Sequence, residues 1–150
     1  MLSAIIITLN EEQMIKDCLI SLKFADETVV VDTGNNDRTT QIAKEFNCRI
    51  ATAQPGSGWD NYRNVGVKAA KGDWILFVDA DERVTPLLKK EIEQVISTEG
   101  EYSAYEIPRR NFYLGKEMFH GGWDNDRVIR LFKRKALLGY KNKLHEQPQV

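Results

Sequence analysis

Short apolar runs alternate with segments of helical period over residues 1–100, and this alternation is the strongest constraint on the fold. Unbroken apolar, β-branched or aromatic runs are typical of buried strands. They occur at Ser3–Leu9, Thr28–Asp32, Arg49–Thr52 and Trp74–Val78. After each of them, apolar residues recur at the spacing of one helix face. Strand–helix alternation with short loops predicts an α/β fold with a doubly wound sheet.

Polar capping residues, together with apolar residues at helical spacing, predict four helices. Asparagine, aspartate and threonine accept hydrogen bonds from the first free amides of a helix, and proline fits its first position. The expected helices are residues 11–23 after the cap Asn10, a helix that carries Ile42, Ala43 and Phe46 after the cap Asp37, residues 59–71 ending at Lys71-Gly72, and one that starts at Thr85 and Pro86.

The helical period disappears after about residue 100. Strand-like patterns replace it at Ser103–Pro108, Arg127–Phe132 and Ala136–Tyr140. A length of 150 residues fits one domain. We therefore expect residues 1–150 to form a single domain, with an α/β core over 1–100 and an incomplete, strand-rich continuation over 101–150.

The composition is that of a soluble globular chain, with 42% hydrophobic and 29% charged residues. The apolar run after Met1 is too short to cross a membrane and lacks the basic start of a signal peptide. The cysteines Cys18 and Cys48 have no metal-binding spacing, so we expect buried, reduced thiols. Together these features predict a cytoplasmic protein.

Charge is distributed unevenly along the chain. Residues 1–108 carry 11 Lys and Arg against 18 Asp and Glu, a net charge of −7, whereas residues 109–150 carry 10 against 4, a net charge of +6. A basic segment beside an acidic one can meet an anionic partner such as a phospholipid surface, a diphosphate or a nucleic acid. The alternative is an ordinary solvated basic face.

The run Trp74–Val78 ends at two carboxylates, Asp79 and Asp81. In open α/β sheets, ligands bind beyond the carboxyl ends of the strands, so this strand would bring two acids to the binding edge. Nearby carboxylates repel each other, and a hard divalent cation such as Mg²⁺ or Mn²⁺ removes the repulsion. The residues favour a metal site that holds a phosphate-bearing substrate, and a solvated acidic turn is the alternative.

The glycine patterns exclude two large classes of nucleotide-binding protein. No G-x-G-x-x-G follows the first strand and no G-x-x-x-x-G-K-[ST] is present, so neither a dinucleotide-binding Rossmann domain nor a P-loop enzyme is expected. Small and polar residues follow the first two strands instead. Asp32 can accept the N–H of a uracil-like base or cap its own turn, and Gly34 allows a tight turn beside a ligand.

Successive sequence blocks resemble those of inverting, GT-A-type glycosyltransferases of family 2. They are Ile5–Glu12, Val31–Thr39, Tyr62–Gly66 and Gly72–Glu82. In the tail, Gly121–Trp123, Asp126–Phe132 and His145-Glu146 are similar to the bacterial subset that builds lipopolysaccharide core and related envelope glycans. The resemblance covers nearly the whole chain.

The resemblance implies a Rossmann-like GT-A fold, which is a three-layer sandwich, and a nucleotide-diphosphate sugar donor, with UDP favoured. A Mg²⁺ or Mn²⁺ ion would bridge the diphosphate and neutralise the charge that develops on it. Matched block by block, the nucleotide-sugar-binding residues are Thr8, Asn10 and Glu11 at the nucleoside, Asp32 at the base, Arg63 near the base or diphosphate, Asp79 near the ribose and metal, and Asp81 on the metal.

Inverting transfer needs a general base that takes the proton of the acceptor hydroxyl. The candidates are Asp124, Asp126, Glu146 and His145, of which Asp126 and Glu146 fit the family blocks. Asp126 is slightly favoured because it follows the Gly-Gly-Trp turn and precedes a strand. The implied acceptor is a glycan or a lipid-linked glycan. The basic region 109–143 would face that acceptor or the anionic cytoplasmic leaflet of the membrane.

Two features depart from the family pattern. Asp124-Asn125 follows Trp123, where the subset usually has an aromatic residue and proline. The chain also stops at Val150, whereas such enzymes usually continue with amphipathic helices. The sequence therefore indicates a truncated chain, and the alternative function is a non-catalytic domain that binds nucleotide-sugar.

Other classes of protein fit the residues less well. A phosphatase of the haloacid-dehalogenase type would have Thr or Val where Arg83 stands, and an EF-hand calcium loop would need glycine at Val84. A sugar-nucleotide pyrophosphorylase would have a basic, glycine-rich loop after the first strand, where this chain is acidic. Nucleic-acid binding is not expected, because the basic residues fall inside strand-like patterns.

Overall fold

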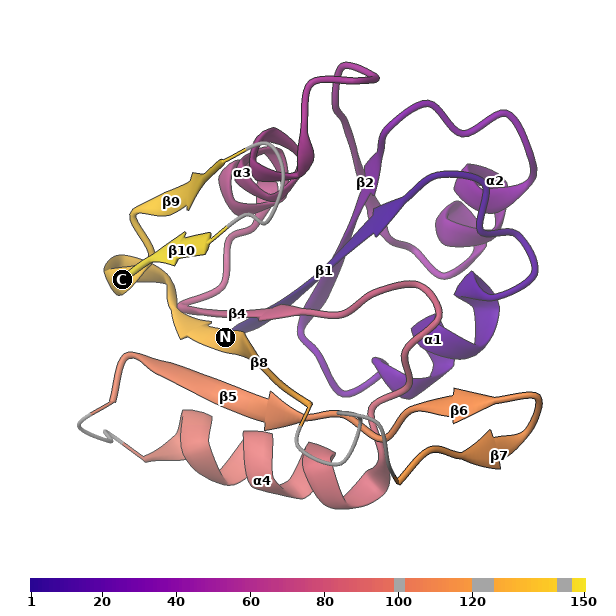
Figure 1. The fold of residues 1–150 in the computed structure, drawn as a ribbon. Helices are drawn as coiled ribbons and strands as arrows, with labels where there is room; N and C mark the ends of the chain where they lie inside the picture. Colours follow the sequence, from indigo (N-terminus) through magenta and orange to yellow (C-terminus); the bar gives the residue numbers. More distant parts are fainter. Residues whose placement is uncertain (99–101, 120–125, 143–146) are drawn as a thin grey trace.

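The structure, a computed structural model, describes residues 1–98, 102–119, 126–142 and 147–150. Its centre is a six-stranded mixed sheet with the strand order β3-β2-β1-β4-β8-β5 (Figure 1). The parallel strands are β1 (Leu2–Thr8), β2 (Glu27–Asp32), β3 (Arg49–Thr52) and β4 (Trp74–Phe77), and β8 (Arg127–Lys133) runs antiparallel between β4 and the edge strand β5 (Ala104–Pro108). These six predicted strands and the α/β class are confirmed.

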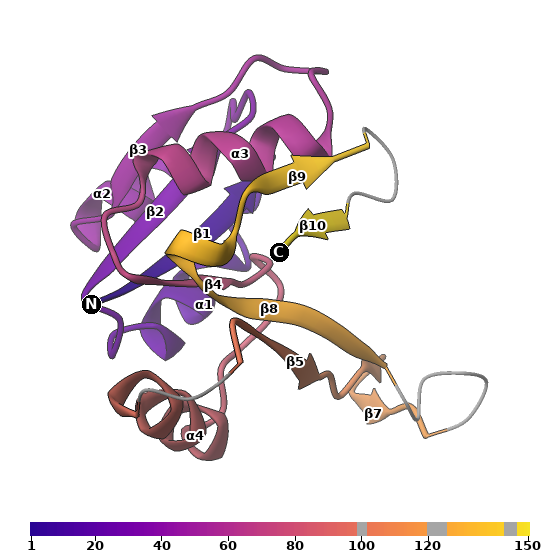
Figure 2. The same cartoon turned by 90° about the vertical axis from the view of Figure 1, so that its left-hand side faces the viewer.

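Helices cover both faces of the sheet, which makes three layers (Figure 2). The side chains of β1 alternate between two cores, as a strand of period two requires. Ala4 and Ile6 pack in the core under α1 (Ile15–Ser21), α2 (Thr39–Glu45) and α4 (Pro86–Ser97). Ile5 and Ile7 pack in the core under α3 (Trp59–Ala69).

The helix α3 approaches β1 closely because Gly66 has no side chain. A Cβ at this position would lie 2.5 Å from Ile5 Cγ2. Replacing Gly66 by alanine is therefore expected to lower the free energy of unfolding by about 1–2 kcal/mol, since an added carbon overpacks the core. Urea unfolding measures this. Lys68→Ala on the exposed side of α3 is the control, and equal stability of the two variants would show that the contact relaxes at no cost.

Two further strands lie against α3. The strand β9 (Gly139–Lys141) pairs antiparallel with β10 (Gln147–Gln149), and Figure 2 shows both beside the helix. The Asn64 side chain joins them to α3, because its Oδ1 accepts from the Tyr140 amide at 2.8 Å and its Nδ2 donates to the Tyr140 carbonyl at 3.1 Å. The pair of strands is thus attached to the core by Asn64 and by the buried ring of Tyr140, which packs against Phe77 and Phe132.

The first helix begins later than predicted. Asn10 is not an N-cap, because it has a left-handed φ of 58° and the helix α1 starts only at Ile15. The Glu11 carbonyl accepts hydrogen bonds from the amides of Met14 and Ile15 at 3.0 and 2.9 Å, which closes a turn before the helix. Residues 12–14 therefore form a turn that leads into the helix.

Capping was predicted correctly for one helix and wrongly for another. The Thr85 side chain accepts from the Leu88 amide at 3.2 Å and Pro86 is the first helical residue, as predicted. Asp37 is not the N-cap of α2, since Arg38 has that position. Asp37 Oδ1 instead accepts from the Thr39 amide at 2.9 Å. Thr39 is the first helical residue, whereas an N-cap side chain accepts from the amide of the second or third helical residue.

The tail differs most from the prediction. A 3₁₀ turn over Arg134–Ala136 and the short β9 replace the single strand expected over Ala136–Tyr140. The sequence analysis also missed β10 and a hairpin formed by β6 (Phe112–Tyr113) and β7 (Lys116–Glu117). Strands of two or three residues contain too few positions for a period of two to be visible. Within the described residues, every helix is too short or too polar to span a bilayer.

Candidate functional site

The loops that follow β1 and β2 are locked together at the carboxyl edge of the sheet. The Asn10 amide donates to Asn35 Oδ1 at 2.7 Å, and Asn10 Oδ1 accepts from the Asn36 amide at 2.9 Å. The Glu11 amide donates to Thr39 Oγ1 at 2.7 Å. The left-handed backbone of Asn10 allows these reciprocal bonds, and asparagine tolerates that conformation better than most residues. The protein's own hydrogen bonds thereby hold the two loops together at this edge.

Thr8 supports this edge from below. It is 1% exposed, and its Oγ1 donates to the Val31 carbonyl at 3.1 Å and accepts from Asn35 Nδ2 at 2.8 Å. The Thr8 carbonyl also accepts from Thr33 Oγ1 at 2.8 Å. The structure therefore places Thr8 at the predicted edge, with its hydroxyl engaged in holding the second loop.

Asp32 ends β2 and organises its own turn. Its Oδ1 accepts from the amides of Gly34 and Asn35 at 2.9 and 2.8 Å, and its Oδ2 accepts from Thr40 Oγ1 at 3.0 Å. Burial alone would raise the pKa of Asp32, but these hydrogen bonds lower it below the ordinary value. The lowered pKa keeps Asp32 ionised at neutral pH. A carboxylate has about four acceptor positions, so these three hydrogen bonds leave room for about one further donor.

Four acids gather where β1, β2 and β4 end. Burial and the negative charges of Asp81, Asp37 and Asp79, in that order, raise the pKa of Glu11. Asp81 is exposed and Asp79 half-buried. Among the residues that the structure describes, no three His, Cys, Asp or Glu side chains are arranged to enclose a metal ion. The predicted acidic edge is present, and its mutual repulsion favours a cation.

The sequence analysis missed Arg130, which is central to this edge. Arg130 is 5% exposed on β8, and its guanidinium forms a two-bond ion pair with Asp79, with Nη1 3.1 Å from Oδ1 and Nη2 on Oδ2. Arg130 Nη2 also lies 3.2 Å from Glu82 Oε1, while Glu82 Oε2 accepts from the Asp79 amide at 2.9 Å. An arginine inside the apolar strand Arg127–Phe132 was the available signal, since buried charges are paired.

These contacts keep Asp79 ionised. Burial of Asp79 would raise its pKa, but the hydrogen bonds and charge of Arg130, with the charges of Arg63 and Arg109, lower the pKa below its usual value. Arg63 itself lies with its guanidinium carbon 5.0 Å from the ring centroid of Phe77 and 5.3 Å from that of Tyr140. The charge of Arg63 thus reaches Asp79, and the structure supplies two aromatic rings that the sequence did not reveal.

Asp126 is connected to the same edge through arginines. Arg109 binds its carboxylate through Nε at 3.0 Å and Nη2 at 2.9 Å, and Asn111 Nδ2 donates at 2.8 Å. Arg109 Nη1 also lies 3.5 Å from Glu82 Oε1, next to Arg130. The hydrogen bonds from Arg109 and Asn111 lower the pKa of Asp126. A chain of alternating charges therefore runs from Asp126 to Asp79.

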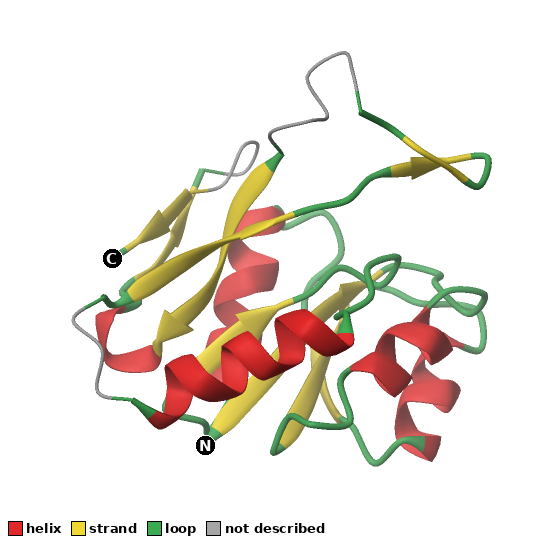
Figure 3. Cartoon of the chain, turned by 90° about the horizontal axis from the view of Figure 1, so that it is seen from below, coloured by secondary structure: helices red, strands yellow, loops and turns green. Residues whose placement is uncertain are grey.

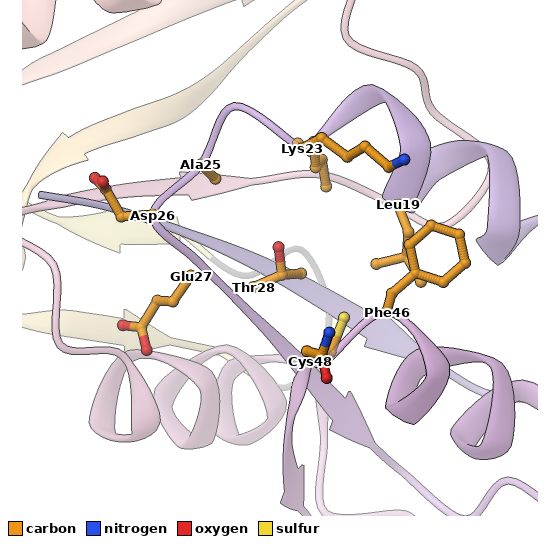
Figure 4. Close-up of a pocket in the computed structure, with 10 residues that line it drawn as sticks. Leu19, Lys23, Ala25, Asp26, Glu27, Thr28, Phe46 and Cys48 are labelled. Atoms are coloured by element: carbon orange, nitrogen blue, oxygen red, sulfur yellow. The ribbon is translucent and has the colours of Figure 1, made fainter.

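The remaining predicted residues lie elsewhere or are not described. Asp124, His145 and Glu146 fall outside the described residues. A pocket of ≈ 250 Å³ lies where β2 and β3 begin (Figure 4). This is the end of the sheet opposite to the carboxyl edge that carries Asp79 and Asp81. Cys48 lines this pocket, and burial raises the pKa of its thiol to about 11. A thiol that stays protonated is a poor nucleophile, so the pocket offers no cysteine chemistry.

Comparison with known proteins agrees with the fold and the sequence blocks. An uncharacterised glycosyltransferase of Rickettsia typhi is 31% identical over 89% of this chain and 47% of its own length. The lipopolysaccharide core biosynthesis glycosyltransferase LpsC of Rhizobium meliloti is 27% identical over 97% of this chain and 56% of its own. The chain thus spans about half the length of these curated relatives.

A solved structure of another protein is also similar to this chain in fold and sequence. The crystal structure of S. aureus TarS 1–349 in complex with UDP-GlcNAc superposes with a TM-score of 0.55 at 31% identity, over 64% of this chain and 30% of the TarS 1–349 chain. The family model described as glycosyl transferase family 2 matches residues 3–147. The architecture expected from the resemblance, a GT-A α/β sandwich, is therefore confirmed. The chain belongs to glycosyl transferase family 2.

Proposed function

We propose that this chain transfers a sugar, with inversion, from a UDP-sugar to a glycan or lipid-linked acceptor in cell-envelope or lipopolysaccharide synthesis. The observation that carries the proposal is the acidic edge, where ionised Asp32 ends β2 and ionised Asp79 follows β4, with the exposed Asp81 two residues beyond Asp79. Two similarities support it. The relative LpsC is named for lipopolysaccharide core biosynthesis, and the structural neighbour TarS was crystallised with UDP-GlcNAc.

The residues of the edge suit the parts of a nucleotide-sugar. The remaining acceptor position on Asp32 can take the N3–H of uracil, because uracil presents one donor there. Asn10 and Glu11 would border the nucleoside from the first loop, and buried Thr8 holds the second loop through Asn35. Arg63, oriented by the rings of Phe77 and Tyr140, would face the diphosphate or the base. These five predicted donor-site residues thus keep a role in the proposal.

A divalent ion fits this edge even though few protein ligands are available. Mg²⁺ is usually held by one or two carboxylates together with substrate phosphates, and Mn²⁺ accepts the same oxygen ligands. Asp81 would hold the ion directly. Asp79 would lie beside it, with its charge fixed by Arg130. When bound, the ion would neutralise the negative charge that builds up on the departing nucleoside diphosphate.

Proton removal from the acceptor hydroxyl is assigned to the tail, where Asp126 and Glu146 are the catalytic candidates. A base must be ionised and only weakly engaged to accept a proton. Asp126 is ionised, but Arg109 and Asn111 already use three of its acceptor positions. We therefore propose Glu146 as the base and Asp126 as the residue that fixes Arg109 beside the acidic edge.

Calorimetric titration of UDP tests the donor site. We expect UDP to bind more tightly with Mn²⁺ than without it, and Asp81→Ala to weaken the Mn²⁺-supported binding by about tenfold, the value of one charge-assisted contact. Asp73→Ala is the matched control, because this exposed acid lies at the opposite end of β4. If a folded sample binds no UDP at millimolar concentration, or if both variants behave alike, the donor assignment is wrong.

A further inference from the structure

The hairpin β6–β7 stands apart from the rest of the fold. Two residue pairs form its ladder, Phe112 with Glu117 and Tyr113 with Lys116, and the Met118 amide donates to the Asn111 carbonyl at 2.9 Å. Leu114 and Gly115 turn the chain with φ angles of 49° and 75°. Figures 1 and 3 both show it projecting away from the six-stranded sheet. An isolated hairpin of this length is marginal in water, so its exposure needs a reason.

The tip of this hairpin is strongly apolar. We define the hairpin tip as Phe112, Tyr113, Leu114 and Phe119, whose exposed fractions are 61%, 68%, 86% and 61%. Single exposed apolar residues are common, but four large ones within eight positions are unusual, and such a concentration favours an interaction surface. None of them belongs to the two cores of the sheet.

Basic residues flank the hairpin tip, although Arg109 pairs with Asp126 and Arg110 pairs with Glu117. Residues 109–119 contain Arg109, Arg110 and Lys116 against Glu117 alone, a net charge of +2, within a tail of +6. Arg110 binds Glu117 and lies 5.6 Å from the ring centroid of Phe112, so a cation sits against the aromatic surface. Lys116 is exposed one residue beyond the turn. Aromatic rings flanked by Lys and Arg are typical of segments that lie in the interface of an anionic bilayer.

The base of the hairpin leads to the proposed active site. Arg109 and Asn111, immediately before β6, both bind Asp126, and Arg109 also reaches Glu82 at the acidic edge. A surface bound by the hairpin tip would therefore lie beside the site where an acceptor must enter. The tip includes Leu114 as its most exposed residue, and an aliphatic side chain inserts into lipid but gives a sugar ring no face to stack on.

We propose that the hairpin tip inserts into the interfacial region of an anionic phospholipid bilayer, with Arg110 and Lys116 at the headgroups. The purpose of this contact, presenting a lipid-linked acceptor, rests on the proposed transferase function. The contact itself does not, because it depends only on the hairpin.

Vesicle sedimentation tests the proposal with the whole chain. Wild type is expected to bind vesicles of phosphatidylcholine with phosphatidylglycerol, to bind pure phosphatidylcholine more weakly, and to lose binding as salt rises. The double variant Phe112→Ser/Leu114→Ser is expected to lower the partition coefficient about tenfold. The control Leu87→Ser removes an equally apolar residue, 69% exposed on α4, and should change it less than twofold.

The remaining outcomes separate the competing partners. Equal vesicle binding by wild type and the double variant, or none by either, overturns the proposal. So does concentration-dependent dimerisation in light scattering that the double variant abolishes, since a second copy then covers the tip. If soluble glycan shields the side chains of the hairpin tip from solvent and vesicles do not, the tip binds the glycan acceptor instead. UDP binding by the double variant should equal that of wild type, so failure of the donor site and failure of this contact are distinguishable.

Discussion

Replacing Glu146 by glutamine is expected to lower the rate of sugar transfer by about 10²- to 10⁴-fold, the usual contribution of a general base. Glutamine keeps the size of the side chain but cannot take a proton. The donor should bind as before, because the proposed donor contacts lie at the ends of β1, β2 and β4 and on α3. The measurement is UDP release from a UDP-sugar that the wild-type chain turns over, with calorimetry to show that UDP affinity is unchanged.

Asp126→Asn is the informative contrast to this variant. Asparagine can still accept a hydrogen bond from Arg109 but carries no charge, so Arg109 would be held less firmly beside Glu82. We expect a loss of about tenfold, the value of one charge-assisted bond. Glu117→Gln serves as the control, because this carboxylate pairs with Arg110 on the hairpin and not with the acidic edge. Asp124→Asn tests the remaining carboxylate among the candidate bases of the tail.

The pattern across these variants decides between the roles. A loss of several hundredfold in Asp126→Asn, with Glu146→Gln near wild type, would make Asp126 the base and contradict our assignment. If the wild-type chain binds UDP but releases none from any UDP-sugar, the chain is a nucleotide-sugar-binding domain without transfer activity. These outcomes do not depend on knowing the natural acceptor, since water can replace it in a slow hydrolysis.

The strands of the sheet were predictable because each carries its own signal. β1, β2 and β4 are apolar on both faces, and only a buried strand requires that pattern. The acids at their ends could be placed together for the same reason, since parallel strands share one carboxyl edge. Glu11, Asp79 and Asp81 therefore met as expected.

The partners of these acids could not be predicted, because they depend on pairings between distant segments. Arg130 reaches Asp79 only when β8 adds antiparallel to β4, and a sequence does not state which strand neighbours which. The capping role of Asn10 was mispredicted. Its local signal, a polar residue before a helix, is outweighed by its hydrogen bonds to Asn35 and Asn36 in another loop. Tertiary contacts of this kind routinely override local propensity.

Removing Arg130 is expected to be the most destabilising single change at the edge. Arg130→Met would leave Asp79 and Glu82 without their shared cation, and breaking a buried pair costs about 3–5 kcal/mol. The Asp79 side chain keeps 40% of its area exposed, so water recovers part of this cost. We expect a loss of about 2–3 kcal/mol in urea unfolding at pH 7. The matched control is Arg127→Met, an exposed arginine on the same strand, with a loss within about 0.5 kcal/mol.

The pH dependence of this loss is a second readout with a fixed sign. The pKa of Asp79 is lowered in the folded protein, so its pairing with Arg130 stabilises the fold above the unfolded carboxylate pKa of about 4. That contribution disappears as the pH falls through the lower, folded pKa. The gap between wild type and Arg130→Met should therefore be full at neutral pH and shrink in acid. In the Asp79→Asn background, Arg130→Met should cost less than in wild type, and equal costs in both backgrounds would show that the two side chains are not coupled.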